Sequence, residues 1–242
     1  MVDSPRLVLI PGLLNDAELW RDQIAGLAGV ARPVVADITR GETLAALARD
    51  VLDIAGERFA GERFAGERFA LAGFSLGGIV AQEIVRIAPE RVSHLALLDT
   101  TMLPDDPERA QERRRLIATA RNPGKFYGFG EHLLRTYLAP ENLGNAEMVE
   151  RVRAMTARLG PEVFIRQSLI DRPDGRATLS RLRCPVLVLC GEHDALTPPA
   201  LHRDMAAGIP LSRLEIVPHA GHLTPIEQPD AVTSALHRLL RG

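Results

Sequence analysis

Lysine is almost absent from this chain of 242 residues. Of its 29 basic residues, all but Lys125 are arginine. Chemistry that needs a lysine nucleophile, a Schiff base or a P-loop lysine therefore has one candidate, which lies in the loop-like run Asn122-Pro123-Gly124-Lys125. The sequence thus argues against these three kinds of site.

An excess of charge of one sign is also missing. The 29 basic residues face 31 acidic ones, and the formal net charge is −2. A nucleic-acid or membrane-surface partner would need a concentrated basic face, so we expect neither. Apolar residues make up 46% of the chain and charged residues 25%, which is ordinary for a globular protein with a full hydrophobic core.

Long apolar runs and cysteine pairs are lacking as well. The first apolar run, Leu7-Val8-Leu9-Ile10, is too short for the core of a signal peptide or for a transmembrane helix, so we expect neither. Cys184 and Cys190 flank a run that is typical of a buried strand. Such a strand separates their α-carbons by about 20 Å, whereas a disulfide needs about 4.4–6.8 Å. We therefore predict reduced core cysteines and a cytoplasmic location.

Short apolar runs alternate with segments of helical spacing along most of the chain. The apolar runs are continuous rather than alternating, which is typical of parallel strands covered on both faces. We therefore predict an α/β fold with a mostly parallel sheet of about six strands, covered by helices on both faces. The predicted strands are 7–10, 32–37, 69–74, 92–99, 185–190 and 213–217. The predicted helices between and after them are 16–27, 43–54, 76–88, 198–208 and 226–240.

Residues 103–182 interrupt this alternation, because they contain no convincing strand. Four helices are predicted there, over 107–121, 130–138, 146–159 and 161–170, separated by proline and glycine. We interpret this block as a helical lid inserted into a core formed by residues 1–102 and 183–242. Half of the chain's aromatic residues fall in the block. These aromatics and one leucine are predicted to roof a substrate pocket, and the alternative is that they form only a packing core: Phe126, Tyr127, Phe129, Leu134, Tyr137 and Phe164.

The pentapeptide Gly-Glu-Arg-Phe-Ala occurs three times in tandem between residues 56 and 70. A period of five is too short for a solenoid, and it turns successive Phe side chains to different sides of a helix or a strand. We interpret residues 56–65 as an expansion by two copies, with only Phe69 in the native strand. Deleting residues 56–65 should leave folding and activity intact, and an insoluble or inactive deletion variant would refute this. The alternative is an interaction motif.

The run Gly73-Phe74-Ser75-Leu76-Gly77 has the pattern G-x-S-x-G and lies between a predicted strand and a predicted helix. Such a turn holds its serine at a strained backbone angle, and a β-carbon at either glycine would collide across the turn. The serine then stands at the positive end of the following helix, which favours a developing anion. We predict Ser75 as a nucleophile, and the alternative is a merely structural glycine-rich turn.

A serine hydroxyl needs a base and an orienting acid to become a good nucleophile. Asp194 follows the predicted strand 185–190, and His222 follows the predicted strand 213–217. Both therefore lie at carboxyl ends of strands, where open α/β sheets bind their ligands. The chain order Ser75, Asp194, His222 is one known order for such a triad.

Other residues near these strand ends are alternatives for the same roles. His219 is an alternative base, and Asp99, at the end of the predicted strand 92–99, is an alternative acid. A metal site could also be considered at these strand ends, formed by His193, Asp194, His219 and His222. That set lacks the H-E-x-x-H spacing and a cysteine cluster, so we expect no metal. No G-x-G-x-x-G run follows a strand, and we expect no cofactor.

With these motifs, the chain resembles the α/β-hydrolase superfamily, in particular its compact esterases, lactonases and carbon–carbon bond hydrolases with helical lids. The resemblance covers nearly the whole chain from Leu7 onward, and its motifs are specific for the superfamily but weakly specific for substrate. They are Leu9-Ile10-Pro11-Gly12-Leu13-Leu14, Leu19-Trp20-x-x-Gln23, the turn at Ser75, Pro89-Glu90-Arg91-Val92, Gly191-Glu192-x-Asp194, and Gly221-His222 with Glu227-x-Pro229.

Three features depart from the usual pattern of this family. Pro11-Gly12 stands where the family usually has His-Gly, although the resemblance still implies an oxyanion donor at Leu13. The turn after Asp37 lacks the common Arg-Gly-His-Gly run. The chain also begins almost at the third strand of the usual eight, so we expect the fold without its N-terminal hairpin.

The resemblance implies a cofactor-independent serine hydrolase for a small or medium carboxylic ester or lactone. In that reaction His222 takes the proton of Ser75, Asp194 orients the imidazole, and the backbone N–H groups of Leu13 and Leu76 bind the oxyanion of the substrate. A carbon–carbon bond hydrolase or a thioesterase with the same triad is one alternative, and a lid-gated small-molecule receptor is another. The expected partner is the small-molecule ester, and a homodimer stays open.

Overall fold

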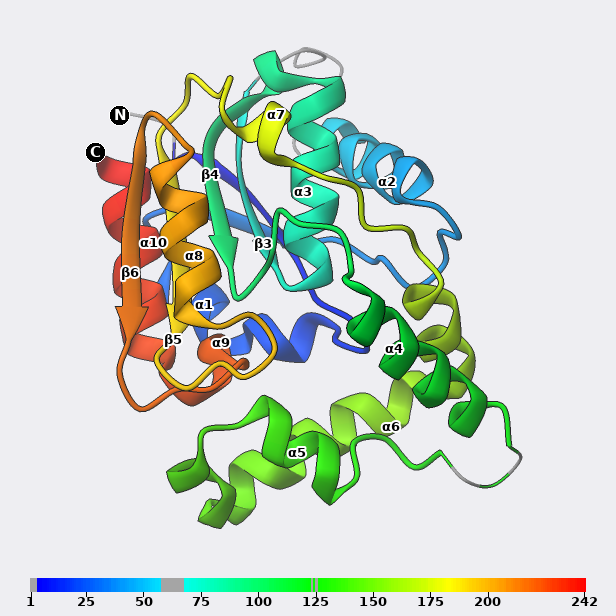
Figure 1. The fold of residues 1–242 in the computed structure, drawn as a ribbon. Helices are drawn as coiled ribbons and strands as arrows, with labels where there is room; N and C mark the ends of the chain where they lie inside the picture. The colour runs from blue at the N-terminus through cyan, green and yellow to red at the C-terminus, as the bar shows by residue number, and fades with distance from the viewer. Residues whose placement is uncertain (1–3, 58–67, 123, 125) are drawn as a thin grey trace.

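Six parallel strands form one sheet at the centre of the described structure (Figure 1). The structure is a computed structural model and describes residues 4–57, 68–122, 124 and 126–242. The strand order is β2-β1-β3-β4-β5-β6, and every neighbouring pair is parallel. The predicted α/β class is confirmed. The strands are β1 (Arg6–Ile10), β2 (Arg32–Val35), β3 (Phe69–Phe74), β4 (Val92–Leu98), β5 (Val186–Gly191) and β6 (Ser212–Val217).

Both faces of the sheet are buried, because helices cover each of them. In β1, Leu7 and Leu9 belong to one apolar cluster, whereas Val8 and Ile10 belong to a second one on the other face. The first cluster includes residues of α10, and Ile24 of α1 packs against it, whereas the second includes residues of α2, α3 and α8. The helices are α1 (Arg21–Gly26), α2 (Leu44–Glu57), α3 (Leu76–Ile87), α8 (Pro199–Ala207) and α10 (Pro229–Arg241).

The strand order reverses beside β1. The chain moves from β1 to β2 at one edge of the sheet, returns to β3 on the other side of β1, and then continues outward to β6. At such a reversal, the loops that follow the two central strands separate and leave a crevice at the carboxyl ends, where α/β proteins bind ligands. The loops after β1 and β3, which carry Leu13 and Ser75, flank this point.

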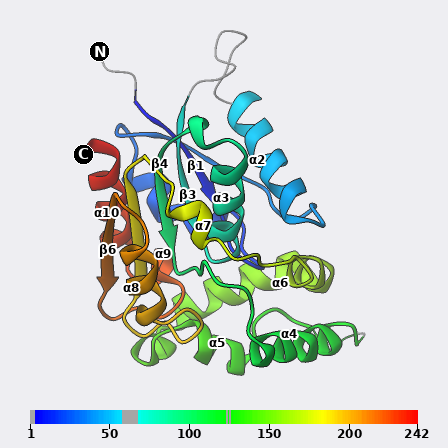
Figure 2. The same cartoon turned by 45° about the horizontal axis from the view of Figure 1, so that its top comes forward.

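A helical segment connects β4 to β5 and lies across the carboxyl ends of the strands. Figures 1 and 2 both show α4, α5 and α6 beyond the arrowheads of the strands. No strand occurs between residues 103 and 182 in the part of this segment that the structure describes. Its elements are α4 (Pro107–Ala120), α5 (Glu131–Tyr137), the short 3₁₀ helix η3 (Pro140–Gly144), α6 (Ala146–Ser168) and α7 (Arg176–Leu179).

One predicted helix break is confirmed, whereas two other predicted helices differ from the observed ones. The predicted helices 146–159 and 161–170 are the two parts of α6, which is interrupted by non-helical backbone at Gly160 (φ 77°) before Pro161. The predicted helix 16–27 begins as a 3₁₀ turn, η1 (Ala17–Trp20). The predicted helix 226–240 is broken at Gln228 into α9 (Thr224–Glu227) and α10, because the residue before Pro229 is disfavoured in the helical region.

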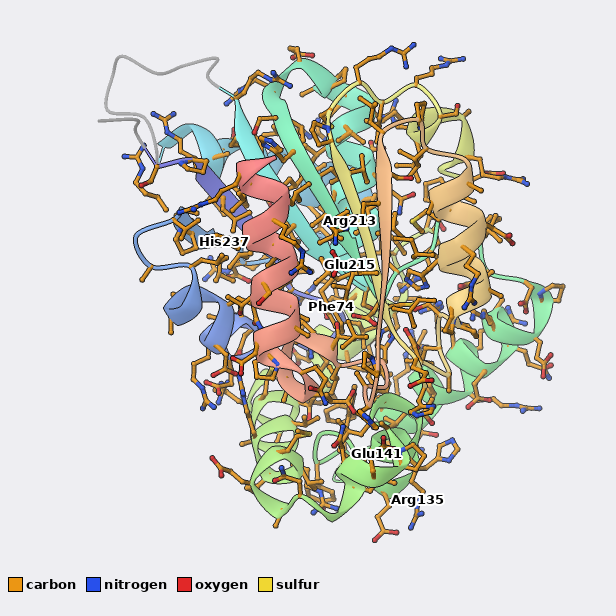
Figure 3. The ribbon with its side chains drawn as sticks, turned by 90° about the vertical axis from the view of Figure 1, so that its left-hand side faces the viewer. Phe74, Arg135, Glu141, Arg213, Glu215 and His237 are labelled. Carbon is orange, nitrogen blue, oxygen red and sulfur yellow. The ribbon has the colours of Figure 1, made fainter. Side chains whose placement is uncertain are left out.

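The edge strand β6 carries charged side chains. Glu215 is paired with Arg213 of the same strand at 3.2 Å and with Arg238 of α10 at 2.6 Å. Figure 3 shows Arg213 and Glu215 on this strand, with Phe74 inside the molecule and Arg135 and Glu141 in the helical segment at its lower end. Charges on an edge strand discourage pairing with another chain.

Three further predictions concern single segments. Cys184 and Cys190 are both buried and unpaired, as predicted. Phe69 lies buried in β3, but most of the repeat at residues 56–65 is outside the described residues, as is Lys125. No helix in the described ranges is both long enough and apolar enough to cross a membrane.

Candidate active site

Ser75 stands in a tight turn between β3 and α3. Its backbone angles are φ 51° and ψ −117°, outside the regions that L-residues favour. A β-carbon at Gly73 would lie 2.4 Å from the carbonyl oxygen of Gly77, and one at Gly77 would lie 2.3 Å from the carbonyl oxygen of Ile10. Only glycine fits at these two positions, so the G-x-S-x-G pattern holds the strained serine in place.

The structure brings Ser75, His222 and Asp194 together from the ends of three strands. His222 Nε2 lies 3.0 Å from Ser75 Oγ, and His222 Nδ1 lies 2.9 Å from Asp194 Oδ2. The His222 side chain is only 1% exposed. These are the contacts that a nucleophile, a base and an orienting acid need.

Asp194 is fixed by four hydrogen bonds. Its Oδ1 accepts from the backbone N–H groups of Leu196 (2.8 Å) and Thr197 (2.9 Å). Its Oδ2 accepts from the Thr197 hydroxyl at 2.6 Å and from His222. Burial opposes the ionised form, but the charge of His222 and the bonds from His222 and Thr197 outweigh it and hold the pKa of Asp194 below its ordinary value. Asp194 is therefore held as a carboxylate, a form that can stabilise a charged imidazole.

The loop that carries His222 is held by the helical segment. The backbone N–H of His222 donates to the carbonyl of Tyr137 at 2.8 Å, and the Tyr137 ring meets the imidazole edge-on at 5.2 Å between centroids. Phe74 contacts the imidazole from the sheet side, also at 5.2 Å. The sequence predicted Tyr137 only as part of a pocket roof, because it offers no signal for a backbone contact between residues so far apart.

Glu227 joins this loop to the helical segment. Its Oε1 accepts from the N–H groups of Gly221 (2.9 Å) and Leu223 (3.1 Å), the two neighbours of His222. Its Oε2 accepts from the N–H of Ala139 (2.7 Å) and from Asn142 Nδ2 (2.8 Å). Burial raises the pKa of Glu227 in spite of these four donors. The sequence marked Glu227 as part of a motif but gave no role for it.

The two residues predicted as oxyanion donors, Leu13 and Leu76, lie at the cavity in front of Ser75. Leu13 follows β1 and Leu76 begins α3, and both residues line the same cavity as Ser75. The N–H of Leu76 has no intrahelical acceptor, because it is in the first turn of its helix. The next residue of the β1 loop, Leu14 (φ 57°), donates its N–H to Gln167 Oε1 of α6 at 2.7 Å. Gln167 was not predicted, because it lies 153 residues from Leu14.

The alternative base, His219, and the alternative acid, Asp99, contact groups outside the chain of contacts from Ser75 to Asp194. The side chain of His219 is 73% exposed and contacts Glu141 at 3.1 Å, and His193 is also partly exposed. Asp99 is fully buried, and its carboxyl binds the N–H of Gly191 at 3.0 Å and the hydroxyl of Thr224. Burial and the negative charge of Asp194 raise the pKa of Asp99 well above its ordinary value. The charged form of Asp99 is therefore disfavoured, which makes Asp99 less suited than Asp194 to holding a charged imidazole.

Oxygen and nitrogen atoms of Asp99, Asp194 and His222 lie within 4.8 Å of one another, which is a spacing that a metal ion could bridge. However, the His222 ring nitrogens contact Ser75 and Asp194, and Thr224 and Gly191 occupy the Asp99 oxygens. The atoms that would ligate a metal are thus engaged with one another and with their neighbours.

A cavity of about 190 Å³ opens onto Ser75 and His222. Phe129, Tyr137 and Phe164, three of the six residues predicted to roof a pocket, lie on its wall. Leu133 lies there too, although it was not predicted. The aromatic side chains thus come from the helical segment, and the reacting groups come from the sheet.

The other three predicted roof residues, Phe126, Tyr127 and Leu134, do not line this cavity. Tyr127 is 77% exposed, because the chain turns at the next residue, Gly128 (φ 84°). Leu134 points into the core, since one residue along a helix rotates the side chain by about 100° from Leu133. Phe126 packs behind the wall, with its ring 5.5 Å from that of Phe164. For Phe126 and Leu134 the alternative of a packing role is correct, whereas exposed Tyr127 fits neither prediction.

Three arginines also line the cavity: Arg109, Arg113 and Arg172. Arg109 and Arg113 lie one helical turn apart on the cavity side of α4, whereas Arg114 and Arg115 of the same helix are exposed.

Comparison with known proteins agrees with this geometry. A family model described as the alpha/beta hydrolase family matches residues 7–235. A thermophilic esterase from Thermogutta terrifontis, solved with malate bound, is 31% identical, with a TM-score of 0.85 over 98% of this chain and 90% of that chain. The enol-lactonase from Burkholderia xenovorans LB400 shares the fold, at 24% identity and a TM-score of 0.86 over 99% and 92% of the two chains.

Similarity to curated sequences covers a smaller part of the chain. BpoC of Mycobacterium tuberculosis, named as a non-heme bromoperoxidase, is 28% identical over 170 residues. That alignment covers 65% of this chain and 62% of BpoC, which is less than two thirds of the relative's own length. The family model, in contrast, spans all six strands. The chain therefore belongs to the alpha/beta hydrolase family.

Proposed function

We propose that this chain is a serine hydrolase that cleaves a small or medium carboxylic ester, or a lactone, through an acyl-enzyme. One observation carries the proposal: Ser75 Oγ, the His222 ring and the Asp194 carboxylate form a continuous chain of contacts, at 3.0 and 2.9 Å, that opens onto a cavity. The 31% identity with an esterase supports the ester as the substrate class.

In the first half of the proposed reaction, Ser75 Oγ attacks the acyl carbonyl carbon while His222 Nε2 accepts the serine proton. The negative charge of Asp194 stabilises the imidazolium that forms. The N–H groups of Leu13 and Leu76 bind the oxyanion of the tetrahedral intermediate, and one such donor contributes about 2.7–4 kcal/mol. The C–O bond to the alcohol then breaks, and the alcohol leaves with the proton from His222.

In the second half, water replaces the alcohol. His222 accepts a proton from the water as its oxygen attacks the acyl carbon, and the same two N–H groups bind the second oxyanion. Collapse of this intermediate breaks the bond to Ser75 Oγ, which regains its proton from His222. The carboxylic acid leaves, and the site returns to its starting state.

We further propose that residues 103–182 act as a lid and the remainder as the catalytic core. The lid supplies Phe129, Tyr137 and Phe164 to the cavity wall, which would exclude water from the oxyanion and contact the acyl or alcohol group. A cavity of about 190 Å³ suits a compact substrate better than a long acyl chain.

The test is hydrolysis of p-nitrophenyl acetate by Ser75→Ala, with Ser180→Ala as a control at an exposed serine. We expect Ser75→Ala to lose essentially all turnover and the control to retain it. Turnover retained in Ser75→Ala would contradict the proposal. A panel of esters, lactones, thioesters and carbon–carbon substrates then separates the esterase from a thioesterase or a carbon–carbon bond hydrolase with the same triad.

A further inference from the structure

The three arginines of the cavity differ in how their charges are balanced. Arg113 donates two hydrogen bonds to the Asp105 carboxylate, at 2.8 and 2.7 Å. Arg109 donates to the backbone carbonyl of Leu196 and lies 3.9 Å from Asp106. The wall has two acidic side chains, Asp105 and Glu112. Glu112 lies 3.6 Å from Arg115, which is exposed. The acidic groups of this wall are thus already paired.

Arg172 has no such partner. It is half-buried in the connection between α6 and α7, and its guanidinium donates to the carbonyl of Ile170. Throughout the described ranges, no carboxylate oxygen lies within 4.0 Å of it. The nearby Asp174 is bound to Arg176 at 3.0 Å instead. Among the described residues, a positive charge therefore stands at the cavity wall without a carboxylate in direct contact, although the charges of Asp105 and Asp171 act on it from a distance.

The surroundings of Arg172 make a lone charge unfavourable. Burial, followed by the positive charge of Arg113, lowers the pKa of Arg172 to about 10, although Asp105 acts in the opposite direction. The guanidinium still carries its charge at neutral pH. Keeping a partly desolvated cation beside a second one costs free energy, which a bound anion would offset.

We infer that Arg172, with Arg113 beside it, binds a carboxylate of the substrate, so that the hydrolase acts on the ester or lactone of an acid that carries a second, ionised carboxylate. This inference rests on the proposed function, because it concerns the same cavity. A guanidinium presents two parallel N–H donors that match the two oxygens of a carboxylate. The scissile carbonyl would lie at Ser75 and the carboxylate at Arg172, with Phe129 and Phe164 facing the short linker between them.

The test compares two methyl esters of equal size. One is monomethyl glutarate, which carries a carboxylate, and the other is the methyl ester of glutaramic acid, in which an uncharged amide replaces it. We expect the wild-type protein to prefer the anionic ester by about ten- to a hundredfold in kcat/KM. Arg172→Gln should lower kcat/KM for the anionic ester by much more than for the neutral ester, and so abolish this preference. Arg172→Lys should keep part of the preference, because it keeps the charge without the fork.

Arg114→Gln is the matched control, since Arg114 is an exposed arginine of the same helical segment that does not line the cavity. This control should change kcat/KM for neither ester. An equal kcat/KM for both esters in the wild type would overturn the inference, and so would an equal loss on both esters in Arg172→Gln, which would indicate a structural role. Glutarate should also inhibit wild-type hydrolysis of p-nitrophenyl acetate competitively, and glutaramide should not. This comparison needs no variant, and equal inhibition by the two would overturn the inference.

The outcomes separate this inference from the proposed function. If p-nitrophenyl acetate is hydrolysed in a Ser75-dependent way but the anionic ester is not preferred, the proposed function stands and the proposed carboxylate site is wrong. If no Ser75-dependent hydrolysis is detected, both proposals are wrong.

Discussion

Glu227 is the position where one substitution should disturb both the loop that carries His222 and the helical segment between β4 and β5. Glu227→Gln keeps the shape of the side chain and changes one carboxylate oxygen into an NH₂ group. Each carboxylate oxygen accepts two hydrogen bonds, at 2.9 and 3.1 Å for Oε1 and at 2.7 and 2.8 Å for Oε2. Whichever way the amide turns, its NH₂ group faces two N–H donors, so two hydrogen bonds are lost.

The expected loss of stability follows from these contacts. A hydrogen bond to a charged group contributes about 1.5–3 kcal/mol, so two of them contribute roughly 3–6 kcal/mol. Burial raises the pKa of Glu227, which means that ionising this carboxyl in the fold has a cost that the amide avoids. We therefore expect a net loss of about 2–4 kcal/mol in the free energy of unfolding. For a chain of this size, that corresponds to a fall in Tm of roughly 4–16 °C.

Activity should fall as well, because Gly221 and Leu223 flank His222. A displacement of the imidazole by about 1 Å would lower kcat roughly a hundredfold. The assay is thermal unfolding together with kcat on p-nitrophenyl acetate, with Glu150→Gln as a control at an exposed glutamate of α6. A Glu227→Gln protein with the Tm and kcat of the control would refute the reasoning.

Three further predictions concern residues around the triad. Gln167→Ala leaves the N–H of Leu14 without its acceptor. It should lower kcat by about ten- to a hundredfold with little change in KM, because the oxyanion amides act mainly in the transition state. A change in KM alone would contradict this prediction. Asp99→Asn should keep kcat within about threefold, because burial and the charge of Asp194 raise the pKa of Asp99 and disfavour its charged form. Asp194→Asn should lower kcat roughly 10⁴-fold. The reverse order would make Asp99 the working acid. The pKa of Asp194 lies below its unfolded value of 3.8, so its contribution to stability is complete above that pH and is lost as the pH falls through the lower, folded value. Urea unfolding should therefore show a smaller loss of stability between pH 6 and pH 3 for Asp194→Asn than for the wild type, and equal losses would contradict the assignment.

The sheet and the three residues at its carboxyl ends were predictable because their signals are local. A continuous apolar run marks each buried strand, and the turn at Ser75 needs two glycines at fixed positions. Asp194 and His222 each follow such a strand directly. In a parallel sheet the carboxyl ends lie at one edge, so strand positions alone bring these residues near one another.

The contacts of the helical segment were not predictable in the same way. Leu14 and Gln167 are bonded across 153 residues of sequence, and neither residue type signals such a partner. The helix α4 has weak apolar periodicity, so its sequence does not show that Arg113 faces the cavity and Arg114 faces solvent. Tyr127 and Leu134 were assigned by residue type, but a turn at Gly128 and the rotation between Leu133 and Leu134 decide where they point.

The most direct test of the central claim is covalent labelling of Ser75. A fluorophosphonate should react with the wild-type protein at one site, and peptide mapping should find the phosphonyl group on Ser75. Loss of ester hydrolysis should match the labelled fraction, and His222→Ala should label slower by several orders of magnitude. Hydrolysis that persists after complete labelling of Ser75, or labelling that proceeds equally fast in His222→Ala, would contradict the account.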